Sequence, residues 1–251
     1  MSAESSEVPL LKVLTVVGTR PEVIKLSRVL AELERHTHHV LVHTGQNFDP
    51  ELNQRLFEEL AIRPPDVILA CAGRGPAETI AQVITGVDAV LERERPDALL
   101  VYGDTNSCYA VLPAKRRQIP IFHMEAGNRC FDQRVPEEIN RKVVDHLSDV
   151  NLPLTEHARR YLLAEGLRPE TVIVTGSPMP EVLDHYAGGI EASGALARLG
   201  LEPGGYLLVS AHREENVDAP DRLAKLLETL TALAATFGRR IVMSTHPRTR
   251  L

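Results

Sequence analysis

LKVLTVVGTRPEVIKLSRVLAELERHTHHVLVHT, residues 11–44, contains two apolar, β-branched runs with a longer segment of helical period between them. The runs LKVLTVV (11–17) and HHVLVHT (38–44) predict strands, and PEVIKLSRVLAELER (21–35) predicts a helix. A strand, a helix and a second strand joined in this way form a βαβ unit, in which the two strands are parallel. The stretch therefore predicts the beginning of a parallel sheet in an α/β protein.

The same alternation continues along the chain. Strands are predicted at DALLVYG (97–103) and PIFHMEA (120–126), and helices at residues 50–60, 106–118 and 136–149. Helices cover both faces of a parallel sheet, so this pattern favours a Rossmann-like domain. Ligands of such sheets bind beyond the carboxyl ends of the strands, and functional residues are therefore sought where each strand ends.

The composition changes after residue 187. GGIEASGALARLGLEPGG (188–205) is rich in small residues and reads as a linker, and a second unit begins at YLLVSAHR (206–213). We expect an N-terminal Rossmann-like domain at residues 1–188, followed at 189–251 by a linker and the first βαβ unit of a second Rossmann-like domain. One βαβ unit cannot bury both faces of a parallel sheet, so the second domain is expected to be truncated in this chain.

Charge and hydropathy argue against several classes of partner. The 28 basic and 34 acidic residues give a net charge of −6 without blocks of like charge, which argues against nucleic-acid binding. No apolar run approaches the ~20 residues of a membrane span, and the first residues lack the pattern of a signal peptide. We expect a cytoplasmic protein with three reduced, structural cysteines, Cys71, Cys108 and Cys130.

Two strand ends carry groups suited to anions or to acid–base chemistry. VVGTRPEVIK (16–25) places Arg20 and Lys25 at the start of a helix, where an anion can bind; the alternative is a plain strand-to-helix turn. Neither a P-loop nor a GxGxxG motif is present. In VYGDTNS (101–107), Asp104 directly follows an apolar strand, and its alternative role is to cap the next helix.

The stretch HMEAGNRCFDQRVPEEINR, residues 123–141, is the densest in charge. His123 and Glu125 are two residues apart and are expected to face the same side of a strand. Glu137 and Glu138 begin the next helix, with Asn140 and Arg141 one turn later, and helix capping explains one of the two glutamates but not the whole group.

Two further interpretations of these strand ends stay open. Asp104, His123 and Glu125 could together bind a metal, although the P-C-x-x-C segment of zinc deaminases is absent. His212, in VSAHREEN (209–216), is either a structural residue or part of the site.

Taken together, GTRPEVIK, GDTNS, HMEAG, PEEINR, TGSP and AHREEN, in this order, resemble the non-hydrolysing UDP-N-acetylglucosamine 2-epimerase family. The resemblance implies two Rossmann-like domains of the GT-B glycosyltransferase type with the active site between them. It implies a UDP-sugar substrate, no cofactor, no metal and a homodimer, and it implies that about a third of the protein lies outside this chain.

The resemblance also implies roles for individual residues. Asp104, Glu125 and Glu137 would handle the proton on carbon 2 of the sugar, and His212 would assist the departure of UDP. The implied substrate-binding residues are Arg20, Lys25, Arg141 and Arg213.

The chain departs from the commonest family pattern in two places. It has HMEAGNRCFDQRVPEE where many members have HVEAGLR and a longer loop, a version that resembles a branch acting on modified UDP-acetamido sugars. We expect residues 128–135 to read a substituent of the sugar ring. HTGQNFDPEL (43–52) replaces the segment of an activating UDP-sugar site, although Gln46 and His246 are retained. Two alternatives remain: a hydrolysing 2-epimerase that releases free sugar and UDP, and a non-catalytic UDP-sugar binding module.

Overall fold

The computed structural model describes residues 10–45, 50–210 and 220–244. The chain divides into two compact units, residues 1–185 and 186–251. The expected boundary at residue 188 falls within helix α7 (Met179–Glu191), and the assignment of domains at that boundary stays a prediction.

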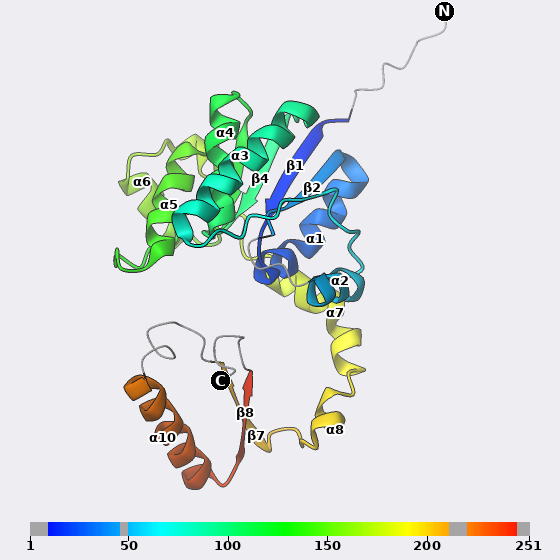
Figure 1. The fold of residues 1–251 in the computed structure, drawn as a ribbon, viewed down its shortest axis with the longest axis vertical. Coiled ribbons are helices and arrows are strands. Elements are labelled where there is room, and N and C mark those ends of the chain that lie inside the picture. The colour runs from blue at the N-terminus through cyan, green and yellow to red at the C-terminus, as the bar shows by residue number, and fades with distance from the viewer. Residues whose placement is uncertain (1–9, 46–49, 211–219, 245–251) are drawn as a thin grey trace, which may run out of the picture. The chain divides into compact units, whose positions relative to one another are not determined.

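The first unit is built on a six-stranded sheet in which every pairing is parallel (Figure 1). The strand order is β3-β2-β1-β4-β5-β6, so the order reverses between β1 and β4. A reversal of this kind opens a crevice at the carboxyl ends of the two central strands. The strands are β1 (Lys12–Val17), β2 (His38–His43), β3 (Val67–Ile68), β4 (Ala98–Tyr102), β5 (Ile121–Met124) and β6 (Val150–Leu152).

Helices cover both faces of this sheet. Figure 1 shows α1 and α2 on one side and α3, α4 and α5 on the other. Alternate residues of β1 supply the two cores, since Leu14 and Val16 pack toward α3 and Val17 packs toward α1. The helices of the unit are α1 (Arg20–His36), α2 (Pro50–Glu59), α3 (Pro76–Glu94), α4 (Val111–Arg116), α5 (Pro136–Leu147) and α6 (Glu156–Ala164), with 3₁₀ turns η1 (Asn106–Ala110) and η2 (Pro169–Thr171). The expected α/β class with a doubly covered parallel sheet is confirmed.

The second unit contains α8 (Ala195–Leu199), β7 (Tyr206–Ser210), α10 (Pro220–Phe237) and β8 (Arg240–Ser244). Strands β7 and β8 are parallel, with Tyr206 opposite Arg240. Two parallel strands with a helix between them in sequence form a βαβ unit, as the pattern of residues 206–251 predicts. Among the described residues of the whole chain, no helix is both long and apolar enough to cross a bilayer.

His43, the last residue of β2, is buried with 1% of its surface exposed. Its Nδ1 accepts a hydrogen bond from the backbone N–H of Gly45 at 3.0 Å, which leaves the ring proton on Nε2. Burial lowers the pKa of His43 from 6.5 to about 4, because the low-dielectric interior disfavours the charged imidazolium. The folded protein therefore carries this histidine in its neutral form.

This buried histidine predicts a pH dependence of stability. Between pH 6.5 and about 4 the unfolded chain binds a proton at His43 that the folded chain does not. The free energy of unfolding should therefore fall by about 2–3 kcal/mol as the pH drops through that window. Urea unfolding of the chain and of His43→Gln, whose amide oxygen can still accept from Gly45, measures the effect. Equal slopes against pH in the two proteins would contradict the prediction.

Candidate active site

The candidate site lies where the chain leaves β1, β4 and β5 and where α5 begins. β1 pairs with β4, and β4 pairs with β5, so the three strand ends are neighbours at the same edge of the sheet. The first exit leads into α1, the second carries Asp104, and the third carries Glu125. The crevice expected from the strand order therefore holds the charged residues that the sequence singles out.

The exits of β1 and β4 are joined by Glu22, a residue that the sequence analysis does not select. Its buried carboxylate accepts hydrogen bonds from the backbone N–H groups of Gly18 at 2.6 Å and Thr19 at 2.8 Å, and from the Thr105 hydroxyl at 2.6 Å. Burial raises the pKa of Glu22, against the effect of the hydrogen bonds from Thr105 and the backbone. The signal for this residue is Thr19-x-x-Glu22, the capping-box spacing at the start of a helix.

Lys25 crosses from α1 to the exit of β5. Its Nζ donates to Oε2 of Glu125 at 2.6 Å and lies 5.1 Å from the centre of the Tyr102 ring. Both charged side chains are partly exposed, with 32% of Lys25 and 14% of Glu125 accessible. Arg20, the first residue of α1, is exposed and lies more than one helical turn before Lys25. A cation that is held in place at an open strand exit can bind an anionic ligand.

Glu125 and His123 have different environments, contrary to the expectation that they face the same side of a strand. Strand β5 ends at Met124, and Glu125 has a φ of 64°, so the alternation of side chains ends before it. His123 is buried, and its ring nitrogens lie 2.8 Å from Oδ1 of Asp145 and 2.8 Å from the carbonyl oxygen of Gly103. Both ring nitrogens are thus within hydrogen-bond distance of protein atoms, and His123 has a structural role next to the site.

Asp104 faces Arg141 of α5. The Nη2 and Nε atoms of Arg141 lie 2.7 and 2.8 Å from Oδ2 of Asp104. Burial raises the pKa of Asp104; Arg141 opposes the rise, and the nearby charges of Glu125 and Glu137 add to it. The three carboxylates therefore interact electrostatically, as expected for a shared site.

The helix-capping alternative for Asp104 does not hold. The N-cap of η1 is Thr105, whose hydroxyl accepts from the backbone N–H of Ser107 at 3.3 Å. The Asp104 side chain is therefore not used to cap the turn.

Glu137 and Glu138 have separate roles at the start of α5. Glu138 is fully buried, and its carboxylate accepts from the backbone N–H groups of Cys130 at 3.0 Å and Phe131 at 3.2 Å, and from Arg141 at 3.2 Å. Glu138 thus anchors the loop of residues 128–135. Glu137 is exposed and forms no hydrogen bond or ion pair within the described part of the chain. Its carboxylate is available to a ligand.

Beneath the loop lies a buried charged network that the sequence analysis does not foresee. Asp145 accepts from Nη1 of Arg129 at 2.7 Å, in addition to its contact with His123. Arg129 also pairs with Glu165 of the turn after α6 at 2.8 and 2.6 Å. Although burial raises the pKa of Asp145, His123 and Arg129 outweigh it and hold this pKa below its ordinary value. The network fixes the segment that joins Glu125 to α5.

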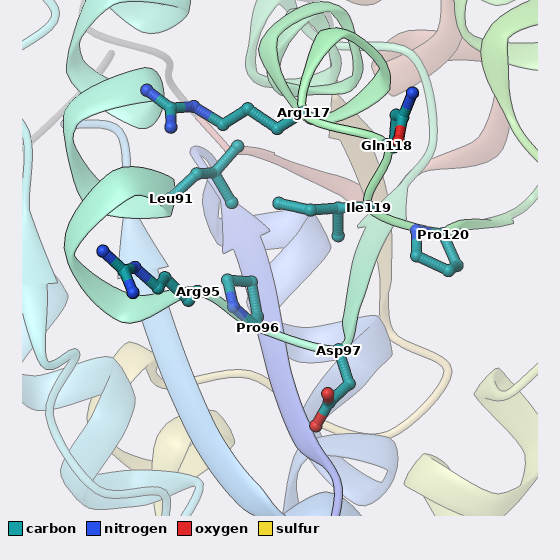
Figure 2. Close-up of a pocket in the computed structure, with 8 residues that line it drawn as sticks. All are labelled: Leu91, Arg95, Pro96, Asp97, Arg117, Gln118, Ile119 and Pro120. Carbon is teal, nitrogen blue, oxygen red and sulfur yellow. The ribbon is translucent and has the colours of Figure 1, made fainter.

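Two hollows lie at opposite ends of the strands, one near the carboxyl ends and one near the amino ends. One, of about 340 Å³, lies beside the site and is lined by Asn128, Arg141 and Tyr161 among others. The other, of about 390 Å³, is lined by residues that precede β4 and β5, including Asp97 and Pro120 (Figure 2). Because ligands of parallel sheets bind beyond the carboxyl ends of the strands, the first hollow belongs to the site and the second does not.

The structure thus brings together Asp104, Glu125, Lys25 and Arg141, with Glu137 close enough to influence Asp104. Among the residues the structure describes, no three His, Cys, Asp or Glu side chains are arranged to hold a metal ion. His212, Arg213, Gln46 and His246 lie outside the described residues.

Comparison with known proteins identifies the family. The family model described as UDP-N-acetylglucosamine 2-epimerase matches residues 31–251. UDP-2,3-diacetamido-2,3-dideoxy-D-glucuronate 2-epimerase of Pseudomonas aeruginosa is 36% identical over 246 residues, which cover 96% of this chain and 68% of that protein. A UDP-N-acetylglucosamine 2-epimerase homolog of Methanococcus maripaludis is 35% identical over 243 residues, with 96% and 67% of the two chains covered.

Similar solved structures belong to the same family as these relatives. A UDP-N-acetylglucosamine 2-epimerase from Rickettsia bellii is 57% identical with a TM-score of 0.89, and the match covers 96% of this chain and 63% of that one. The Methanocaldococcus jannaschii enzyme, solved in complex with UDP-GlcNAc and UDP, is 32% identical with a TM-score of 0.88, and the match covers 96% and 67%. The chain therefore spans about two thirds of the length of its relatives and has the two-domain fold expected from the sequence. This chain belongs to the UDP-N-acetylglucosamine 2-epimerase family.

Proposed function

We propose that the protein inverts carbon 2 of a UDP-N-acetylhexosamine by eliminating UDP to give a glycal and then adding UDP back. The observation that carries the proposal is the grouping of Asp104, Glu125 and Glu137 with the cations Lys25 and Arg141 at the exits of β4 and β5. A module that only binds a UDP-sugar has no need of interacting carboxylates around the ring.

The reaction explains why carboxylates and cations are needed together. The proton on carbon 2 is not adjacent to a carbonyl, so it becomes removable only as the bond from carbon 1 to the diphosphate oxygen breaks. Positive charge then grows on the ring and negative charge on the departing UDP. Carboxylates can take the proton and stabilise the ring, and cations can stabilise the diphosphate. Return of a proton to the other face of carbon 2, with re-addition of UDP at carbon 1, completes the inversion.

We assign Lys25 and Arg20 to the diphosphate and the three carboxylates to proton transfer at carbon 2. The raised pKa of Asp104 makes its carboxylate a better proton acceptor than an ordinary aspartate, which suits a group that exchanges a proton. Because Asp104, Glu125 and Glu137 interact, the proton belongs to the group rather than to one fixed residue. Arg141 would hold Asp104 and contact the substrate, while His212 and Arg213 would assist the departure of UDP, as the family resemblance implies.

We propose a modified UDP-acetamido sugar as substrate, with the loop of residues 128–135 next to the ring substituent. The 340 Å³ hollow between this loop and α6 supports the proposal. The Pseudomonas aeruginosa enzyme, whose name specifies a diacetamido sugar, is 36% identical, while the Rickettsia bellii protein, named for UDP-N-acetylglucosamine, is 57% identical, so the panel of UDP-sugars below has to include both kinds of sugar. Arg134 is exposed and pairs with Asp132 at 2.7 Å on the same loop, so replacing either side chain should leave the core undisturbed. We further propose a cytoplasmic homodimer that requires no cofactor.

The test is incubation of the full-length protein with a panel of UDP-sugars, with the configuration at carbon 2 read by proton NMR. We expect a UDP-sugar product inverted at carbon 2, formed equally well with EDTA present and without added NAD. Free sugar with UDP would show the hydrolysing alternative. Binding of UDP-sugars without turnover of any of them would show the non-catalytic alternative and contradict the proposal.

A further inference from the structure

Tyr102 ends β4 beside the proposed site and carries a hydroxyl without a partner. The residue is buried with 3% of its surface exposed, and its hydroxyl forms no well-aligned hydrogen bond with a described residue, although the Glu125 carboxylate lies close enough to act on the phenol. Burying an unpaired hydroxyl costs free energy, because the group gives up its hydrogen bonds to water. Such a group next to acid–base residues calls for an explanation.

The neighbours of Tyr102 are the pair formed by Lys25 and Glu125. The ammonium of Lys25 lies 5.1 Å from the centre of the ring and 2.6 Å from the Glu125 carboxylate. Burial raises the pKa of the Tyr102 phenol most, and the adjacent carboxylate of Glu125 raises it next. The phenol therefore keeps its proton. Glu125 accepts a hydrogen bond from Lys25, and the Tyr102 hydroxyl is a second donor close to it.

The pairing of β4 with β5 keeps Tyr102 and Glu125 close to each other. Tyr102 pairs with Met124 in the ladder between β4 and β5, and Glu125 is the next residue of the chain. The ring of Tyr102 packs in the core that β1 and β4 form with α1, so its position is fixed. The Glu125 carboxylate already acts on the phenol, so a movement of that carboxylate together with rotation of the hydroxyl about its own bond would form the hydrogen bond.

We propose that Tyr102 is a positioning residue that holds the Glu125 carboxylate when substrate engages Lys25. The proposal rests on the proposed function, in which Lys25 binds the diphosphate. An ammonium drawn toward a diphosphate loosens its hold on Glu125, and the Tyr102 hydroxyl then supplies the missing hydrogen bond. A neutral donor stabilises a carboxylate less than an ammonium does, so this exchange of partners keeps Glu125 aimed and makes it a better proton acceptor during turnover.

A spectroscopic experiment tests the exchange without any turnover. The 251-residue chain has five tyrosines, and labelling them with ¹³C at Cζ gives signals that respond to hydrogen bonding by the hydroxyl. The Tyr102 signal is the one lost in Tyr102→Phe. Lys25→Met mimics withdrawal of the ammonium and should move this signal, while the signals of Tyr109 and Tyr161 stay in place. In the double variant Lys25→Met, Glu125→Ala the movement should disappear. A Tyr102 signal that does not respond to Lys25→Met, or that moves equally without Glu125, would overturn the proposal.

A kinetic experiment on the full-length protein tests the consequence for catalysis. Tyr102→Phe keeps the ring over which Lys25 lies and removes only the hydroxyl, so kcat should fall about tenfold with KM changed less than about twofold. The matched control is Tyr109→Phe, a half-buried tyrosine of η1 that packs against the opposite core, for which kcat should not change. An unchanged kcat in Tyr102→Phe would contradict the role. If the unmodified protein epimerises no UDP-sugar, the proposed function fails, and the spectroscopic result still decides whether the hydroxyl and Glu125 interact.

Discussion

Glu125→Gln and Glu137→Gln should each lower the rate of epimerisation by about 10²- to 10⁴-fold in the full-length protein. Glutamine keeps the shape and most of the hydrogen-bonding capacity of glutamate but cannot accept or return a proton. KM should change much less than kcat, because the lost interaction belongs to the transition state. Initial rates with the UDP-sugar that is turned over most rapidly give the measurement.

The matched control is Glu92→Gln. Glu92 lies near the end of α3, 3.7 Å from Arg117, a residue of the hollow near the amino ends of the strands (Figure 2). The substitution makes the same change of charge away from the proposed site, so the rate should stay within about twofold of the unmodified value. A loss of activity in Glu92→Gln as large as in Glu125→Gln would show that charge alone, rather than position, decides the effect.

Arg129→Met should lower the free energy of unfolding by about 3–5 kcal/mol, because it leaves the Asp145 carboxylate buried without its arginine partner. The two side chains have 0% of their surface exposed, and Arg129 also binds Glu165. Methionine keeps the unbranched apolar stem of arginine and removes the charge, so the loss reports mainly the broken charge network. Urea unfolding followed by circular dichroism measures the change.

Arg168→Met is the control for this prediction. Arg168 pairs with Glu170 at 3.4 Å, but 74% and 64% of the two side chains are exposed. An exposed ion pair contributes at most about 1 kcal/mol, so this variant should unfold almost as the unmodified chain does. If Arg129→Met is no more destabilising than Arg168→Met, the network beneath the loop of residues 128–135 is not needed for the fold.

The fold could be predicted from the sequence because a parallel sheet imposes a simple pattern. Strands buried on both faces are continuous apolar runs, and the helices between them have their own period. The rule that ligands bind beyond the carboxyl ends of strands then selected Asp104 and Glu125, which the structure places at adjacent exits. These predictions needed only local patterns and the general geometry of parallel sheets.

The hydrogen-bond and ion-pair partners of individual side chains could not be predicted from the sequence. They depend on the conformations of loops and on which face of a helix each residue occupies. Glu137 and Glu138 are consecutive, yet only Glu138 points back to the loop, where backbone N–H groups bind it. The partners of Arg129 are 16 and 36 residues away, a separation that no local pattern encodes. The roles of Tyr102 and Glu22 likewise emerge only when the strand ends are seen side by side.

The most direct test of the proposed chemistry is turnover in D₂O by the full-length protein, with deuterium at carbon 2 of the UDP-sugar followed by NMR. Elimination and re-addition predict that solvent deuterium enters carbon 2 as epimerisation proceeds. Both rates should fall together in Glu125→Gln and in Glu137→Gln. Inversion at carbon 2 without entry of deuterium, or exchange at the unmodified rate in both variants, would contradict the assignment of these carboxylates to proton transfer.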